Sequence, residues 1–352
     1  MRCEVLRLRD FEAVAKDWTA LAADHTQAPF LHADFVGALI DEFADGSERL
    51  VRVTSNDQLL ALGLFKRRGL MWETFQPSQM PIGCLVARRG AALASLLPLI
   101  GRALPGLTLG VAATQQDPLS FERPSDTEEL RTLDYISTAA IDIVGSFDDY
   151  WNARGKNLRQ NLRKQHRKLA DESTRVTLEA LRDRTDIVEA IGDHGALESA
   201  GWKAGGGTAL SADNPQGRFY RKALEAFCGR DRAVVYRYRF DDRVVVVDLC
   251  VESEDTIVIL KTTYDESLRT YSAASLMREE AFRLLWGGGR IKRIEFFGRA
   301  MEWHLRWSEQ LRLMYHVNWY RWPALARWSA WAAQRLRPAS KATGGEAVTE
   351  AN

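Results

Sequence analysis

The chain has 352 residues, of which 46% are hydrophobic and 27% are charged, and its formal net charge is +1. This composition predicts a folded globular protein with room for two ordinary domains, and the near-zero charge gives no overall attraction to nucleic acid. The four cysteines contain no CxxC pair, so we expect reduced, buried thiols and no zinc site. We expect neither a secretory signal nor a membrane span, because the most apolar region, 91–113, is broken by Pro98, Arg102 and Pro105.

The first half of the chain is predicted to form one compact α/β unit. The expected elements are a strand at 4–9, helices at 11–23 and 33–43, a hairpin of 49–54 with 59–66, a strand at 70–75, a helix at 88–104 and a strand at 107–111. The polar stretch 115–131 contains Pro118 and Pro124, which indicates a loop or a connector between the two halves.

A basic segment lies near the start of the second half, after a predicted strand at 135–144. Seven Arg or Lys residues and no acid occur between Trp151 and Ala170. We expect one helix over 148–171 that packs through apolar residues and presents a basic face. That face could bind RNA, a membrane surface or an anionic cofactor, or it could simply be solvated. It carries no interleaved aromatic residues, which argues against base stacking.

The remaining elements follow nearly the same order as those of the first half. We expect a strand at 176–178, helices at 186–198 and 215–228, a strand meander at 233–240, 244–251 and 257–262, a helix from Ser272, and strands at 290–297 and 313–320. Two tandem copies of one α/β unit are the simplest explanation of this order.

The end of that meander forms a strand, a polar loop and a helix that opens with small residues, Ser272-Ala273-Ala274-Ser275. Free N–H groups and the helix dipole make such a helix start favourable for an anion such as a phosphate. Alternatively, Ser272 is only a helix N-cap and the loop binds nothing. The sequence contains neither GxGxxG nor a Walker A motif.

Four segments carry a resemblance to a known family: YWNARGKNLRQNLRKQHRKLAD, ESAGWKAGGGTAL, KTTYDESLRTYSAASLM and FFGRAMEWHLRW. In this order the chain resembles the GNAT-like acyltransferases of bacterial cellulose and polysaccharide biosynthesis, which are related to the Fem-type aminoacyl transferases. The likeness covers roughly residues 10–320 and has two departures. Ala273-Ala274 replaces a common proline-glycine pair, and Trp303-His304 replaces a common tyrosine-lysine pair.

The resemblance implies an α/β (α+β) fold of two tandem GNAT-like units, each a mixed, mainly antiparallel sheet flanked by helices. The expected boundaries are 1–132 for the first unit, 133–322 for the second unit with the donor site, and 323–352 for a Trp/Arg-rich segment and tail. It further implies an enzyme that moves an acyl group from acyl-CoA, without a metal, to an amine or hydroxyl of a sugar, lipid or small molecule. Lys261 and the residues Ser272, Ala273, Ala274 and Ser275 would bind the donor.

Acyl transfer to an amine requires a base, a stabilised oxyanion and release of the thiolate. Asp248 is the first candidate base, because a carboxylate inside the apolar strand VVVVDLCV is costly unless it is paired or functional. It could also face outward or pair with an arginine. Tyr264 or His304 could protonate the thiolate, since an unperturbed histidine has a pKa of about 6.5. His304 could equally be structural.

The acceptor side is predicted from the glycine-rich segment and the strand end. Trp202 and Lys203 are expected to line the acceptor pocket, although Trp202 could instead pack on the core. Asp265 and Glu266, at the end of the 257–262 strand, are further candidates for binding the substrate or accepting its proton.

Two alternatives remain beside acyl-CoA chemistry. The first is a Fem-type transferase that uses aminoacyl-tRNA, which the basic helix favours. The second is a catalytically degenerate partner in polysaccharide or envelope assembly, which the two departures favour. We expect a cytoplasmic protein, and the Trp/Arg-rich stretch from Trp319 to Arg337 either contacts the inner face of the membrane or packs on the domain.

Overall fold

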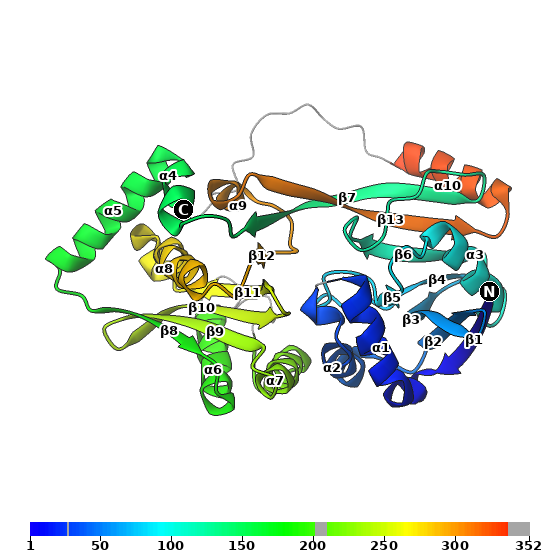
Figure 1. The fold of residues 1–352 in the computed structure, drawn as a ribbon, viewed down its shortest axis with the longest axis horizontal. Helices are drawn as coiled ribbons and strands as arrows, with labels where there is room; N and C mark the ends of the chain where they lie inside the picture. Colours follow the sequence, from blue (N-terminus) through cyan, green and yellow to red (C-terminus); the bar gives the residue numbers. More distant parts are fainter. Residues whose placement is uncertain (27, 201–209, 337–352) are drawn as a thin grey trace. The chain divides into compact units, whose positions relative to one another are not determined.

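A computed structural model of the chain describes residues 1–26, 28–200 and 210–336 (Figure 1). The described residues form two compact units. The first consists of 1–26, 31–137 and 312–336, and the second of 28–30 and 138–311. None of the helices in this described part has the length and apolar character needed to span a bilayer.

The first unit contains a mixed, mainly antiparallel sheet. Its strands are, in spatial order, β1 (Arg2–Arg7), β2 (Arg49–Ser55), β3 (Gln58–Arg68), β4 (Met71–Thr74), β6 (Gly110–Gln116) and β13 (Gln310–Tyr320). β5 (Leu85–Ala87) also pairs with β3, and only β4 and β6 run parallel. The helices are α1 (Phe11–His25), α2 (Ala33–Phe43), α3 (Leu93–Ala103) and α10 (Pro323–Leu336). The buried side chains of α1 recur every three or four residues, from Phe11 to His25, as expected for a helix packed on one face.

The second unit also contains a mixed sheet. Its strands are, in spatial order, the end of β7 (Leu130–Asp142), which belongs to this unit from residue 138 onward, then β12 (Arg293–Glu295), β11 (Thr256–Tyr264), β10 (Arg243–Glu252), β9 (Ala233–Phe240) and β8 (Val176–Leu181). β11 and β12 are parallel, and the other neighbours are antiparallel.

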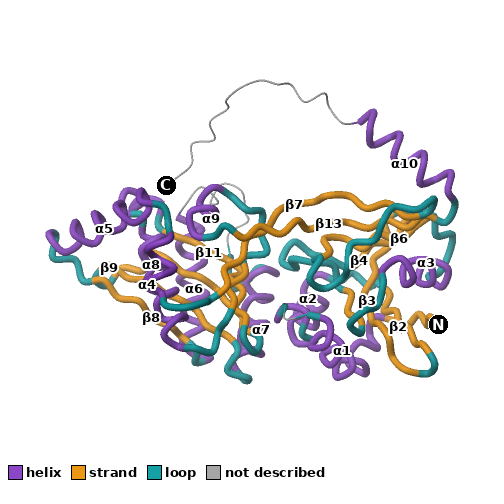
Figure 2. Tube along the Cα trace, turned by 45° about the horizontal axis from the view of Figure 1, so that its top comes forward, coloured by secondary structure: helices purple, strands orange, loops and turns teal. Residues whose placement is uncertain are grey.

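Helices cover both faces of this second sheet, as Figures 1 and 2 show. Apolar side chains of α4 (Phe147–Ala153), α5 (Lys156–Asp171) and α8 (Ala273–Gly288) share one core cluster with the sheet, together with Trp307 at the end of α9 (Glu302–Trp307). α6 (Arg184–Ala200) and α7 (Pro215–Cys228) contact the sheet from the other side. The predicted fold class, two tandem α/β units with mainly antiparallel sheets and flanking helices, is confirmed.

Two sequence-based expectations are corrected by the structure. The single helix expected over 148–171 is two helices, because Arg154 is extended (φ −71°, ψ 155°) and Gly155 caps the second one. The strand expected at 107–111 is instead Gly110–Gln116, where pairing with β4 and β13 is available. The loop predicted within 115–131 is present between β6 and β7, and two of its residues, Asp117 and Phe121, are buried.

Residues 312–322 group with the first unit, whereas the sequence-based boundaries place them in the second. The reason is the pairing of β13 with β6 from Tyr315 to Tyr320, a contact between segments about 200 residues apart in the chain.

Candidate active site

The second unit has an open strand edge next to a helix start. β11 pairs with β10 from Val246 opposite Tyr264 to Glu252 opposite Ile257, but it pairs with β12 only from Thr256 to Val258. From Ile259 onward, no strand in the described part of the chain pairs with that second edge of β11. Backbone N–H and C=O groups on such an edge are available to a ligand with amide groups.

The chain runs from β11 through a 3₁₀ helix, η4 (Glu266–Tyr271), into α8. Ser272 occupies the N-cap position in the left-handed conformation (φ 53°), and its side chain makes no capping hydrogen bond to α8. Its hydroxyl instead accepts a hydrogen bond from Asn161 Nδ2 of α5 at 3.1 Å. By helix geometry, the N–H groups of Ala273 and Ala274 have no acceptor within α8. The helix start therefore keeps the features expected of an anion site, without a side-chain cap in place.

Cations of α5 lie next to this helix start. Lys168 sits 3.7 Å from the ring centroid of Tyr271, and Asn161 contacts Ser272. Lys164 is exposed and falls between Asn161 and Lys168 on the same helical stripe. Exposed basic side chains of α5 with no acidic partner among the described residues are Lys156, Arg163, Lys164 and Arg167.

A buried pair of opposite charges occupies the α8 face of the sheet. Asp248 is 1% exposed, so the predicted burial of this carboxylate is observed, and Arg278 of α8 is 5% exposed. Burial raises the pKa of Asp248, while Arg278 and the Thr262 hydroxyl act against that rise. Burial likewise lowers the pKa of Arg278, and Asp248 opposes this. Arg278 Nη2 donates to Thr262 Oγ1 at 3.3 Å, on the open stretch of β11.

This pair is not fully satisfied. Asp248 Oδ1 and Arg278 Nε have no hydrogen-bond partner within the described part of the chain. The Arg278 guanidinium also lies 4.1 Å from the ring centroid of Trp303. Two unsatisfied buried charges in contact with an open strand edge are typical of a functional site.

His304 lies on α9, stacked on Trp303 with ring centroids 3.4 Å apart. Its Nδ1 accepts a hydrogen bond from the N–H of Met301 at 2.9 Å. Burial and then the nearby Arg278 charge lower the pKa of His304 to about 4. The unperturbed value assumed from the sequence is therefore wrong. At neutral pH the ring is neutral with its proton on Nε2, so it can donate one hydrogen bond but is not an imidazolium.

Tyr264 ends β11 on the same face as Thr262 and packs against the core under α8. Burial, and next the Glu266 charge, raise the pKa of its phenol. The hydroxyl is thus protonated near neutral pH and can donate a proton or a hydrogen bond, but it cannot act as a phenolate base.

The opposite face of β11 carries a second set of ionisable groups. Lys261 Nζ lies 3.1 Å from Glu198 Oε1 of α6, and Glu198 is 3% exposed. Glu198 Oε2 also accepts the N–H of Leu210 at 2.9 Å. His194, one turn earlier on α6, is fully buried with Nδ1 3.8 Å from Glu198 Oε2. Lys261 therefore belongs with α6, on the face away from α8.

A cavity of about 330 Å³ adjoins these α6 residues. Small side chains line most of it, among them Gly192, Gly195, Ala196, Ser199, Ala212 and Gly217. Leu210 lines the cavity as well and donates its N–H to Glu198, so the cavity and the Glu198–Lys261 pair are neighbours.

The other predicted acceptor residues are found in different situations. Asp265 forms an ion pair with Arg243 and accepts hydrogen bonds from Ser267 N at 3.0 Å and Ser267 Oγ at 2.6 Å, so it caps η4. Glu266 begins η4 and is partly buried. Trp202 and Lys203 lie outside the described residues.

Sequence reasoning missed Arg278 and Glu198. Arg278 shares a helical stripe with Ala281, Phe282 and Leu285, and a cation on an apolar stripe is a detectable signal of a buried charge. Glu198 had no such signal, because its partner Lys261 is 63 residues away.

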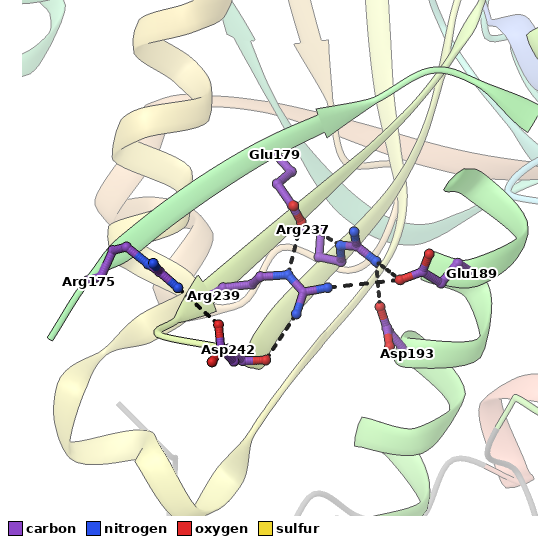
Figure 3. Close-up of polar contacts among 7 residues, drawn as sticks. All are labelled: Arg175, Glu179, Glu189, Asp193, Arg237, Arg239 and Asp242. Atoms are coloured by element: carbon purple, nitrogen blue, oxygen red, sulfur yellow. Dashed lines mark hydrogen bonds and ion pairs between the residues drawn. The ribbon is translucent and has the colours of Figure 1, made fainter. Parts of the chain in front are cut away.

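Another cluster of charges is structural (Figure 3). Arg237 of β9 is 7% exposed and contacts three carboxylates: Glu179 at 2.5 Å, Glu189 at 2.8 Å and Asp193 at 2.9 Å. Burial alone would lower the pKa of Arg237, but these carboxylates outweigh it and raise the pKa. Every charge here has a partner, and no group of three or more potential metal ligands was found anywhere in the described ranges.

Comparisons with known proteins agree with this architecture. Residues 156–305 match the family described as an acetyltransferase (GNAT) domain. This stretch runs from α5 to α9 and contains the open edge of β11, the start of α8 and the Asp248–Arg278 pair. The second unit therefore carries a GNAT domain of the acyltransferase kind. No match was found among curated proteins.

Solved structures resemble the chain over nearly its whole length. One is the C-terminal domain of an Agrobacterium fabrum protein described as a lysylphosphatidylglycerol synthetase, with TM-score 0.59, 13% identity, and 93% of this chain and 97% of that chain covered. FemX matches with TM-score 0.57 and 9% identity over 92% of this chain and 99% of its own. L-PGS from Bacillus licheniformis matches with TM-score 0.51 and 14% identity, covering 87% and 91%. At such low identity these likenesses show a shared fold.

Proposed function

We propose that the second unit transfers an acyl group from acyl-CoA to an amine, or to a hydroxyl, of a sugar, lipid or small-molecule acceptor. The observation that carries this proposal is the separation of β11 from β12 after Val258, followed by the α8 start with its small residues. An open strand edge suits the two amides of a pantetheine arm, and a helix N-terminus suits its pyrophosphate.

The donor would lie along the open stretch of β11 and end at α8. Backbone N–H groups of Ala273 and Ala274, together with Lys164 of α5, would hold the pyrophosphate. Backbone N–H groups of β11 would stabilise the oxyanion that forms when the acceptor nitrogen attacks the thioester carbon.

Proton transfer would involve the groups on the α8 face. The attacking amine loses a proton to Asp248, directly or through water, as its lone pair forms the new C–N bond. The tetrahedral intermediate then expels the CoA thiolate, which takes a proton from the Tyr264 hydroxyl, while the Nε2–H of neutral His304 can donate a hydrogen bond to it. Arg278, close to Asp248 and to Thr262, opposes the rise that burial imposes on the pKa of Asp248 and so favours its ionised form.

The acceptor would approach from the α6 face, through the cavity beside Glu198 and Lys261. Its small-residue lining leaves room for a sugar or a lipid headgroup, and the Glu198–Lys261 pair offers both a carboxylate and a cation to polar groups. Trp202, Lys203 and Glu266 remain predicted contributors. A cytoplasmic protein serving polysaccharide or envelope assembly agrees with the use of acyl-CoA and with the family resemblance.

Isothermal titration with acetyl-CoA and with a long-chain acyl-CoA tests the donor. We expect micromolar binding that Ser272→Glu weakens by about tenfold or more, because a carboxylate at the α8 start repels the pyrophosphate. Ser78→Glu, which adds the same charge at an exposed site in the first unit, is the matched control. Absence of binding to every acyl-CoA would remove this proposal.

A Fem-type transferase that uses aminoacyl-tRNA is the second candidate, and the unpaired cations of α5 favour it. In that case tRNA should bind with a steep salt dependence. The double variant Arg163→Glu with Arg167→Glu should reduce the affinity for tRNA, and added acyl-CoA should not change that affinity. If neither acyl-CoA nor tRNA binds, a non-catalytic role in envelope assembly is what remains.

A further inference from the structure

Helix α10 is attached to the first unit by one side. Ala326 is fully buried, and the Tyr320 hydroxyl lies 2.6 Å from Ser329 Oγ. Trp319, the last residue but one of β13, is 1% exposed, and the Arg102 guanidinium lies 5.6 Å from its ring centroid. Trp319 is therefore part of the core, which corrects its inclusion in a membrane-contacting stretch from Trp319 to Arg337.

The other side of this segment presents large aromatic rings to solvent. Trp322, Trp328 and Trp331 are 49%, 65% and 49% exposed. Residues of an α-helix advance by about 100° each, so Trp328 and Trp331 lie roughly opposite the buried Ala326. Arg327 is exposed next to Trp328. Exposed aromatic rings beside a cation on one helix face are typical of an interfacial surface.

Along the sequence, the charged residues that flank these tryptophans have a single sign. No Asp or Glu occurs between Gln310 and Glu346. The same stretch contains the six cations Arg312, Arg321, Arg327, Arg335, Arg337 and Lys341. Arg312 is buried against Asp117, at 2.8 Å, so it does not contribute to the surface charge. A whole chain with net charge +1 thus concentrates positive charge next to its exposed tryptophans.

We propose that α10 docks on an anionic lipid bilayer, with Trp328 and Trp331 in the headgroup region and Arg327 against lipid phosphates. Tryptophan is favoured at the membrane–water interface because its ring is apolar and its N–H is polar. Each basic residue near an anionic surface strengthens binding by about fivefold. The helix does not span the bilayer, and the surface does not depend on acyl transfer in the second unit.

Co-sedimentation of the full chain with vesicles tests the docking. We expect binding to vesicles of phosphatidylglycerol and phosphatidylcholine, and at least about tenfold weaker binding to phosphatidylcholine alone. The variant Trp328→Ser with Trp331→Ser should lose about tenfold in partitioning, because apolar area no longer enters the interface. Arg327→Glu should bind more weakly and lose part of the salt dependence. Leu119→Ser, at a residue 66% exposed in the same unit, is the matched control.

Bromine-labelled lipids provide a second measurement. They should quench tryptophan fluorescence in the wild type and much less in the double tryptophan variant, with unchanged circular dichroism. Equal binding to neutral and anionic vesicles, no binding to either, or unchanged binding by both variants would overturn the proposal.

Discussion

Arg278 and Asp248 lie in the core of the second unit although each carries a formal charge, and each has an atom without a hydrogen-bond partner in the described part of the chain. A buried pair of this kind is seldom retained for stability, because apolar residues of similar size often do as well or better. Its position beside the open stretch of β11 gives it a functional reason instead. The two residues should therefore respond very differently to single and paired replacement.

Arg278→Met should lower the free energy of unfolding by about 3 kcal/mol, because Asp248 then stays buried without its cation. Combining Arg278→Met with Asp248→Asn should restore stability to within about 1 kcal/mol of the wild type. Urea denaturation at neutral pH measures both values. A single variant as stable as the wild type would contradict the close coupling of these two charges.

The penalty in Arg278→Met should depend on pH. Burial raises the pKa of Asp248, so the native state takes up a proton at a higher pH than the unfolded chain. Stability then rises as the pH falls from neutral toward the ordinary carboxyl pKa of about 4, where the carboxyl is neutral in both states. Repeating the urea titrations across this range tests the sign, and the double variant, which lacks the carboxyl, should show a flatter profile.

His304 should remain uncharged down to acidic pH. Nitrogen-15 NMR of the histidine rings should show the Nε2–H tautomer at neutral pH and a titration midpoint near 4, since burial and Arg278 both disfavour the imidazolium. Accordingly, its protonation should not appear in a rate profile between about pH 5.5 and 8. A midpoint near 6.5 would mean that the ring is accessible to water and far from the Arg278 charge.

At the scale of elements, the ion cluster around Arg237 joins β8, β9 and α6 (Figure 3). Arg237→Ala should lower the free energy of unfolding by about 3 kcal/mol, because three carboxylates lose a shared, nearly buried partner. Arg175→Ala removes a more exposed ion pair of the same region, with Asp242, and should cost less than about 1 kcal/mol. Denaturant unfolding of both variants compares them directly, and equal effects would contradict the central place of Arg237.

Elements with a clear hydrophobic period were predictable from the sequence. Helix α7 and strand β9 have the predicted bounds, and α1, α2 and β11 differ by at most two residues at each end. Local patterns failed where tertiary contacts decide the structure. The break at Arg154–Gly155 coincides with a hydrogen bond from the Arg154 guanidinium to the carbonyl of Trp307, which no local pattern encodes. The same holds for the site: Asp248 and Arg278 each leave a signal in their own element, but no local pattern shows that the two lie close together.

At the scale of the whole molecule, the order of strands along the chain does not give their grouping. β13 pairs with β6 in the first unit, although the chain up to Leu311, which includes the first two residues of β13, belongs to the second unit. A repeat of element order predicts two units, but a return of the chain to the first unit adds a long-range contact that has no signal in composition or periodicity. The division matters because the proposed donor site draws on residues of the second unit alone.

Hydrogen exchange with and without acetyl-CoA tests that division. Ligand binding stabilises the native state by about 2.7 kcal/mol at a hundredfold excess over the dissociation constant, and the protection falls on segments that the ligand orders. We therefore expect slower exchange in β11, η4 and the first turns of α8, and unchanged exchange in the strands β1 to β4 of the first unit. Ser272→Glu should reduce the protection, to about half where binding is tenfold weaker, whereas Ser78→Glu should keep it. Protection centred on the first unit would place the donor site there and exclude the start of α8.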